Sequence, residues 1–499
     1  MKGSLSRLLL LLMLFTWVLP IPLAIAGEGT GELSNGEYLQ DVMNLVKDNY
    51  HFDVDNTQLL ENSIKGMFYS LDDYTEFYTT EEAEQFLQSV DGRYEGIGVV
   101  LTCLGDYVMI TQVFPLSPAE KAGLFSGDKI ASVDGKDVRG KGIDEVAALI
   151  KGEEGSRVSL GIIRDNNDKL LSISVARGRI KLNPVNYNIR DGIGYISIET
   201  FNSNTNEYLL QALTDMEYNG IEKVILDLRN NTGGEVSQAV AVARNFVPEG
   251  LIATLEFRAP SRGDLIYESS LKSTKYQLVV LVNGMTASSS EILAGAIQDS
   301  GAGILVGTKT YGKARVQSII PILTPEACNI YGKYFSARIV DGNSLLSRYG
   351  VQAGSDEIIG WAKITTGIYK TPKGRNIDGY GLTPDIVVGD HEPVAGIYLN
   401  SIADLSRTAK PGLNEEGIDV YNAEKILRIS GYDVDVPDMR LDERTYAAIK
   451  DFQRDNALHS YGVLDYSTQD ALNKKLQQLL KEIDKQYARA VQYLKNENI

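Results

Sequence analysis

Three consecutive serines, Ser288 to Ser290, follow an apolar run at 278–282 and a short turn at 283–286, and they open a helical pattern. This order predicts a strand, a tight turn and a helix. A serine at such a junction projects from the edge of a sheet, and the first N–H groups of the helix are free to bind a developing oxyanion. The junction therefore suits a serine nucleophile, although serines before a helix also serve simply as N-caps.

A serine nucleophile needs a general base, and the sequence restricts the choice. The histidines of the chain are His51, His391 and His459. None lies near Ser288 in the sequence, which disfavours a histidine base. Lys313 follows Ser288 by 25 residues, after a short apolar strand pattern. A buried lysine can lose its proton and then accept one from a hydroxyl, so Ser288 and Lys313 are predicted to form a dyad.

Other chemistry finds less support in the sequence. Asp227, Glu291 and Asp385 could be read as the acid pair of a glycosidase, but helix caps and ion pairs explain isolated acids more simply. No cluster of residues has the spacing of metal ligands. We therefore expect neither a metal nor a cofactor.

The stretches around the dyad resemble motifs of the carboxy-terminal processing peptidases, also called tail-specific proteases. Residues 286–292 are similar to T-A-S-A-S-E-I, residues 312–317 to G-K-G-x-V-Q, and residues 226–234 to L-D-L-R-x-N-P-G-G. The resemblance extends over residues 36–388. It implies a serine endopeptidase with a crotonase-like α/β core.

The resemblance also assigns roles to single residues. It makes Ser288 the nucleophile, Lys313 the base and Gln317 the residue that orients the lysine. The oxyanion hole would be formed by backbone N–H groups of Gly233, Gly234 and Ser289.

Three departures from the family pattern stand out. Ser289 occupies a position where alanine is usual, and Thr232 one where proline is usual. Neither removes a catalytic group, but Ser289 adds a second hydroxyl and leaves open which serine attacks; Ser288 is preferred. Residues 320–360 replace a short connection, and we expect this insertion to extend the substrate groove or to form a lid.

Residues 94–176 read as short strands around one helix and resemble a PDZ domain, with 124–130 matching its G-L-x-x-G-D-x-I motif. In such domains, exposed N–H groups of a loop hold a peptide carboxylate while the following strand edge pairs with the peptide. The residues that would form this peptide site are Gly96, Ile97, Gly98 and Val99 in the loop, and Val146 and Ile150 on the helix.

The organisation predicted for the whole chain is multidomain α/β, because strands alternate with helices in the protease core. In chain order it comprises a signal peptide or membrane anchor (1–26), an N-terminal helical region (36–90), a PDZ domain (94–176), the core (179–390), a linker (391–417), a peptidoglycan-binding-like three-helix domain (418–477) and a charged helical tail (478–499). The residues that carry the resemblance to a peptidoglycan-binding module include 423–427, Phe452-Gln453 and 462–465. They also fit a simple helical cap on the protease.

The first residues predict a secretory leader. Lys2 and Arg7 precede an apolar run at 8–25, and the small residues Ala24 and Ala26 favour cleavage after Ala26. The run is also long enough for an uncleaved membrane anchor. No cysteine follows it closely, which excludes a lipoprotein anchor. The rest of the chain is therefore expected outside the cytoplasm.

Composition agrees with a modular secreted protein. At roughly 150 residues per domain, 499 residues suggest about three domains. The formal net charge of −17 argues against a nucleic-acid partner. Cys103 and Cys328 fall in different predicted domains, so we expect no disulfide between them.

These observations predict an extracytoplasmic serine endopeptidase, secreted or anchored near the cell wall. Its expected partners are unfolded or flexible protein C-termini, with peptidoglycan, an activating protein and a second copy bound through terminal helices as further candidates. The alternative is a non-catalytic PDZ scaffold tethered to the cell wall.

Overall fold

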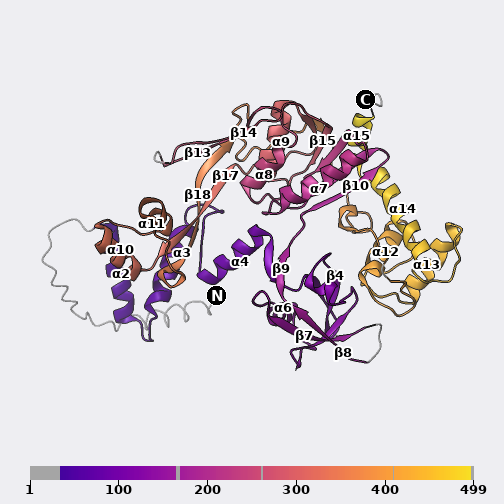
Figure 1. Ribbon diagram of the computed structural model, residues 1–499, viewed down its shortest axis with the longest axis horizontal. Coiled ribbons are helices and arrows are strands. Elements are labelled where there is room, and N and C mark those ends of the chain that lie inside the picture. The colour runs from indigo at the N-terminus through magenta and orange to yellow at the C-terminus, as the bar shows by residue number, and fades with distance from the viewer. Residues whose placement is uncertain (1–33, 165–168, 260–261, 391, 408, 496–499) are drawn as a thin grey trace, which may run out of the picture. The chain divides into compact units, whose positions relative to one another are not determined.

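The computed structural model describes residues 34–164, 169–259, 262–390, 392–407 and 409–495 (Figure 1). The predicted leader at 1–26 lies outside these ranges. The chain divides into two compact units, Met1–Gly66 and Met67–Ile499. Each helix within the described ranges is too short or too polar to cross a membrane.

The N-terminal region, which was predicted to be helical, contains three helices and a short strand that was not predicted. Its elements are α2 (Asn35–Asn49), α3 (Asn56–Tyr69), β1 (Glu76–Tyr78) and α4 (Thr80–Asp91). The sequence encodes the start of α4, because the Thr79 side chain accepts from the Glu82 N–H while the Glu82 carboxylate accepts from the Thr79 N–H. Strand β1 is only three residues long, too short for its alternation to be recognised in the sequence.

The segment predicted to be a PDZ domain forms a six-stranded sheet in the order β3-β4-β5-β7-β8, with β6 beside β5. Its elements are β3 (Val99–Leu104), β4 (Tyr107–Val113), α5 (Pro118–Lys121), β5 (Lys129–Val133), β6 (Lys136–Asp137), α6 (Ile143–Ile150), β7 (Arg157–Ile163) and β8 (Leu171–Ala176). The segment is bracketed by β2 (Arg93–Gly96) and β9 (Gly178–Lys181), which pair antiparallel with Gly96 opposite Gly178. The chain therefore enters and leaves this domain through two adjacent strands.

The core is built on a second six-stranded sheet, ordered β10-β11-β12-β15-β16-β19. Its strands are β10 (Val185–Arg190), β11 (Ile193–Ile198), β12 (Lys223–Asp227), β15 (Gln277–Val282), β16 (Gly303–Gly307) and β19 (Ile386–Val387). All but β10 run parallel. The carboxyl ends of β12 and β15 consequently lie at the same edge of the sheet, where the loops that follow them meet.

Both faces of this sheet are buried. Val224 and Leu226 of β12 belong to the main core, whereas Ile225 between them belongs to a separate cluster on the other face. The main core is completed by α7 (Thr205–Tyr218), α8 (Val236–Ala243) and α9 (Ser289–Ser300). The other face is covered by α15 (Lys485–Leu494), which Figure 1 shows beside β15.

A five-stranded antiparallel sheet lies next to the core, with β18 at its centre. Besides β1 it contains β13 (Gly250–Phe257), β14 (Leu265–Ser269), β17 (Arg315–Leu323) and β18 (Ile358–Lys370). The insertion predicted at 320–360 contains the end of β17, the helices α10 (Pro325–Phe335) and α11 (Gly342–Tyr349), and the start of β18. Leu323, Ala327, Ile339 and Leu345 give it a small core of its own.

The C-terminal module contains α12 (Ile418–Ile429), α13 (Glu443–Asp455) and α14 (Tyr466–Ile483), which share one buried cluster. Leu399 and Leu405 belong to the same cluster, so part of the predicted linker packs into the module.

The boundary predicted at residue 477 is wrong. Helix α14 continues to Ile483, and the break comes at Asp484, whose side chain caps α15. The tail is therefore not one charged helix. Tyr487, Ala490 and Leu494 recur at helical spacing and are buried against the core sheet.

Candidate active site

The candidate nucleophile lies on a strained turn between β15 and α9. Ser288 has φ 57° and ψ −119°, a conformation that costs a non-glycine residue on the order of 1–3 kcal/mol. Its N–H donates to Glu291 Oε2 over 2.9 Å, and the Tyr369 hydroxyl donates to its carbonyl oxygen over 3.2 Å. These bonds hold Ser288 in the kind of strand-to-helix elbow that presents a serine hydroxyl.

Glu291 connects this elbow to the lysine loop. Its side chain is fully buried, and Oε2 accepts from the N–H groups of both Ser288 and Lys313, each over 2.9 Å. Oε1 accepts from the Thr310 hydroxyl over 2.5 Å and from the Gly312 N–H over 2.8 Å. Burial raises the pKa of Glu291, while these hydrogen bonds oppose the rise. One carboxylate thus fixes the backbone of both candidate catalytic residues.

Lys313 is partly buried, and its surroundings disfavour its charged form. Burial lowers its pKa, the nearby Lys363 ammonium lowers it further, and Asp72 and Glu76 partly oppose both effects. The amine lies 4.4 Å from the centre of the Tyr74 ring. A lysine with a lowered pKa is what a general base at this position requires.

The two side chains are not joined in this conformation. Among the hydrogen bonds of the described residues, none connects the Ser288 hydroxyl with the Lys313 amine. Gln317 lies on β17, where its amide NH2 donates to Thr365 Oγ1 over 3.1 Å. Among the described residues, no hydrogen bond joins the Gln317 side chain to the Lys313 amine. Thr365 in turn donates to the Asp72 carboxylate over 3.4 Å.

The glycine loop lies directly against the elbow. A Cβ atom on Gly233 would come within 2.8 Å of the Ser288 Cβ, so this position requires glycine. The Gly233 N–H donates to Asn231 Oδ1 over 2.9 Å and is therefore already occupied. Within the described part of the chain, the N–H groups of Gly234 and Ser289 have no acceptor. These two are consequently the readier oxyanion donors of the three that we predicted.

The other two serines are tied to the glycine loop. Ser289 Oγ donates to the Gly234 carbonyl over 2.7 Å, and Ser290 Oγ donates to the Asn231 carbonyl over 3.0 Å. Both residues are fully buried, whereas Ser288 is partly exposed. The geometry therefore favours Ser288 over Ser289 as the nucleophile.

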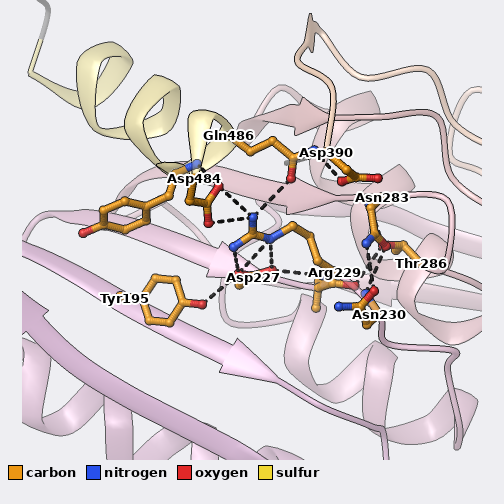
Figure 2. Close-up of polar contacts among 11 residues, drawn as sticks. Tyr195, Asp227, Arg229, Asn230, Asn283, Thr286, Asp390, Asp484 and Gln486 are labelled. Atoms are coloured by element: carbon orange, nitrogen blue, oxygen red, sulfur yellow. Dashed lines mark hydrogen bonds and ion pairs between the residues drawn. The ribbon is translucent and has the colours of Figure 1, made fainter. Parts of the chain in front are cut away.

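A pair of asparagines links the loop after β12 with the turn before Ser288 (Figure 2). The Asn230 N–H donates to Asn283 Oδ1 over 3.0 Å, and Asn283 Nδ2 donates to Asn230 Oδ1 over 2.9 Å. Asn230 has φ 62°, a left-handed conformation that asparagine tolerates better than most residues. Neither this pair nor the bridging role of Glu291 was anticipated from the sequence.

In the PDZ-like domain, the proposed carboxylate loop precedes β3, and α6 contacts β3. Gly98 has φ 85°, and a Cβ atom there would lie 2.5 Å from the Ser117 Cβ, so the turn needs glycine. Ile97, Val146 and Ile150 all belong to the buried cluster of the domain. The described residues contain no cluster of His, Cys, Asp and Glu that could hold a metal ion.

Comparison with known proteins matches three segments of the chain. The profile of Peptidase family S41 matches residues 192–388, that of a PDZ domain residues 109–164, and that of a peptidoglycan binding domain residues 416–472. A PDZ domain, a peptidoglycan-binding domain and an S41 peptidase domain therefore occur in this chain.

The chain is also similar to curated relatives and to a solved structure over more than one domain. The carboxy-terminal processing protease CtpA of Bacillus subtilis strain 168 is 30% identical over 508 aligned positions, covering 100% of both chains. The carboxy-terminal-processing protease of Bartonella bacilliformis is 31% identical over 355 positions, covering 70% of this chain and 74% of that protein. A solved photosystem II D1 C-terminal processing protease is 28% identical with a TM-score of 0.37, covering 71% of this chain and 88% of that one. The chain thus belongs to the carboxy-terminal processing proteases of peptidase family S41, which are serine peptidases.

Proposed function

We propose that this chain is an extracytoplasmic endopeptidase that cleaves peptide bonds with a Ser288–Lys313 dyad and selects substrates by their C-termini. The observation that carries the proposal is the buried Glu291 carboxylate, which accepts from the backbone N–H groups of both residues. The lowered pKa of Lys313 and the engaged hydroxyl of Ser289 support the same assignment.

In the first half of the reaction, the neutral amine of Lys313 accepts the hydroxyl proton as Ser288 Oγ attacks the scissile carbonyl carbon. The resulting oxyanion accepts hydrogen bonds from the N–H groups of Gly234 and Ser289. The lysine ammonium then gives its proton to the departing amine, and the C–N bond breaks to leave an acyl-enzyme.

In the second half, Lys313 removes a proton from water, and the hydroxide attacks the ester carbon. The Ser288 Oγ–carbonyl bond breaks, and the serine regains its proton from the lysine. Before either half, the amine must approach Ser288 Oγ. We expect Gln317 to orient the Lys313 amine once the amine is close to Ser288 Oγ, after the hydrogen bond from Gln317 to Thr365 has broken.

The accessory domains would bring substrate and enzyme together. The loop at 96–99 would hold the substrate carboxylate, and the peptide would add a strand to the edge of β3. The leader would direct the enzyme across the membrane. The C-terminal domain would then bind peptidoglycan and keep the enzyme near the cell wall. The further candidate partners are an activating protein and a second copy of the chain. The core would have a crotonase-like fold. The insertion that contains α10 and α11 would border the substrate groove.

The experiment uses the chain from Gly27 onward, incubated with an unfolded protein that has an apolar C-terminus. We expect fragments to accumulate with the unaltered enzyme and none with Ser288→Ala of equal melting temperature. A non-catalytic scaffold would instead bind this protein without cleaving it, with or without Ser288. Equal fragment yields from the two enzymes would rule out Ser288 as the nucleophile.

A further inference from the structure

The last helix of the described chain contacts Arg229, in the loop that also contains Gly234, one of the proposed oxyanion donors (Figure 2). Arg229 Nη1 donates to Asp484 Oδ1 over 2.9 Å and to Gln486 Oε1 over 3.2 Å. On its other side, Arg229 Nη2 donates to Asp227 Oδ2 over 2.6 Å. The guanidinium is therefore held between the end of β12 and the start of α15.

This ion pair is withdrawn from solvent. The side chains of Arg229 and Asp484 are 8% and 4% exposed, and that of Asp227 is 6% exposed. Burial by itself lowers the pKa of Arg229, but the two carboxylates outweigh it and raise the pKa well above the ordinary value, so the charge is retained. Removing one partner of such a pair leaves a buried charge under-compensated. The place of Arg229 thus depends on α15.

Arg229 is also next to the machinery of the site. The following residue, Asn230, makes the two hydrogen bonds to Asn283 that join the loop to the turn before Ser288. The Thr286 hydroxyl in that turn donates to the Leu228 carbonyl over 2.9 Å. A shift of Arg229 would therefore displace Leu228 and Asn230, which are hydrogen-bonded to the turn before Ser288.

Helix α15 is fixed to the core by more than the arginine. Gln486 Nε2 donates to the Val388 carbonyl over 3.0 Å and to Asp390 Oδ1 over 2.8 Å, while Asp484 Oδ1 accepts from the Tyr487 N–H over 2.9 Å. The Tyr487 ring packs edge-on against Tyr195, with 5.8 Å between centroids. In the chain, α15 directly follows the peptidoglycan-binding domain, so it connects that domain with the catalytic loop.

We propose that Asp484 and Gln486 are positioning residues for peptide hydrolysis, which act by holding Arg229 and thereby the loop 228–234 against the Ser288 turn. This inference rests on the proposed function. Because the loop supplies a donor to the oxyanion, a small displacement lowers the rate of the chemical step more than it weakens substrate binding.

The test compares Asp484→Ser and Gln486→Ala with the unaltered enzyme. Serine still caps α15 but is too short to replace the carboxylate on Arg229. Alanine at 486 keeps every charge and removes one acceptor of Arg229, together with the hydrogen bonds to Val388 and Asp390. With a fluorogenic peptide that has an apolar C-terminus, we expect kcat to fall about ten- to a hundredfold in Asp484→Ser and less in Gln486→Ala. KM should stay within about twofold in both.

Leu494→Ala is the matched control. It weakens the packing of α15 on the sheet, which lowers the melting temperature, but it leaves the contacts of Arg229 in place. We expect its kcat to stay near that of the unaltered enzyme at a temperature where every variant is folded. A kcat in Asp484→Ser within about twofold of normal would overturn the inference, as would equal losses of kcat in Leu494→Ala and Asp484→Ser. Failure of the unaltered enzyme to cleave, or cleavage by Ser288→Ala, would instead refute the proposed function and the inference with it.

Discussion

Glu291 holds together the backbone segments that carry the candidate nucleophile and base. Ser288 and Lys313 could be chosen from the sequence because the stretches around them resemble motifs of one protease family and no histidine lies near Ser288 in the chain. The role of Glu291 could not be predicted in the same way, since its four hydrogen bonds join backbone segments that approach only in the folded chain. In the sequence it had the pattern of an ordinary N3 residue of a capping box.

Glu291→Gln tests this role. The amide NH2 would face N–H and O–H donors, so some of the four hydrogen bonds are lost, at about 1–3 kcal/mol for each buried group left unpaired. We expect a lower melting temperature and a kcat reduced at least about tenfold, because the elbow and the lysine loop are no longer held together. Peptide hydrolysis and thermal unfolding measure the two effects.

Glu424→Gln provides the control, because Glu424 is also fully buried and accepts from the Thr445 hydroxyl over 2.7 Å. Burial raises the pKa of Glu424 to about 7, so a neutral amide already resembles its protonated form. We expect kcat to be unchanged in this variant. Equal kcat losses in the two variants would show that general destabilisation explains both.

A second prediction separates the neighbouring hydroxyls. Ser289→Ala removes the hydrogen bond to the Gly234 carbonyl but leaves the Ser289 backbone N–H in the oxyanion hole. We expect kcat to fall less than about tenfold, whereas Ser288→Ala should abolish cleavage. Initial rates of peptide hydrolysis distinguish them, and an inactive Ser289→Ala enzyme beside an active Ser288→Ala enzyme would reverse the assignment.

Among the helices and strands, those with strong periodicity agree closely with the sequence expectations. The apolar run at 278–282 forms all but the first residue of β15, because an apolar run flanked by turn residues defines a strand locally. Strand β1 and the packing of α15 were missed. Both depend on partners that are distant in the chain, because β1 pairs with β18 and α15 packs on the core sheet.

The pairing of β2 with β9 offers a way to remove the PDZ domain cleanly. Gly96 lies opposite Gly178, so residues 97–177 can be replaced by an Asn-Gly turn that closes the two strands as a hairpin. We expect the shortened enzyme to cleave peptides with free and amidated C-termini equally, while the full chain prefers the free carboxylate. A preference that survives the deletion would contradict carboxylate recognition by this domain.

At the scale of the whole molecule, the C-terminal domain is not a simple appendage, because the chain returns to the core after it. A chain that ends at Ile483 keeps α12 to α14 but exposes Ile225, Val279 and Leu281 on the sheet. Burying a side chain such as Leu494 contributes about 1.5–3 kcal/mol.

We therefore expect this truncation to retain peptidoglycan binding, measured by co-sedimentation. It should melt several degrees lower and should lose activity. An unchanged melting temperature would mean that α15 contributes little to the core.

The pH dependence of kcat/KM tests the central claim, the Ser288–Lys313 dyad, most directly. Burial and the neighbouring Lys363 lower the pKa of Lys313 from its ordinary value of 10.5, so the neutral amine becomes available at a lower pH. Only the neutral amine accepts the serine proton. We predict that kcat/KM of the unaltered enzyme rises with pH in a single step whose midpoint lies below pH 10.5. Gln317→Ala should lower kcat/KM without moving this midpoint. Lys313→Arg should be inactive at every pH. A plateau reached already near pH ~6.5, the range of histidine, and unchanged in Lys313→Arg would show that another group is the base.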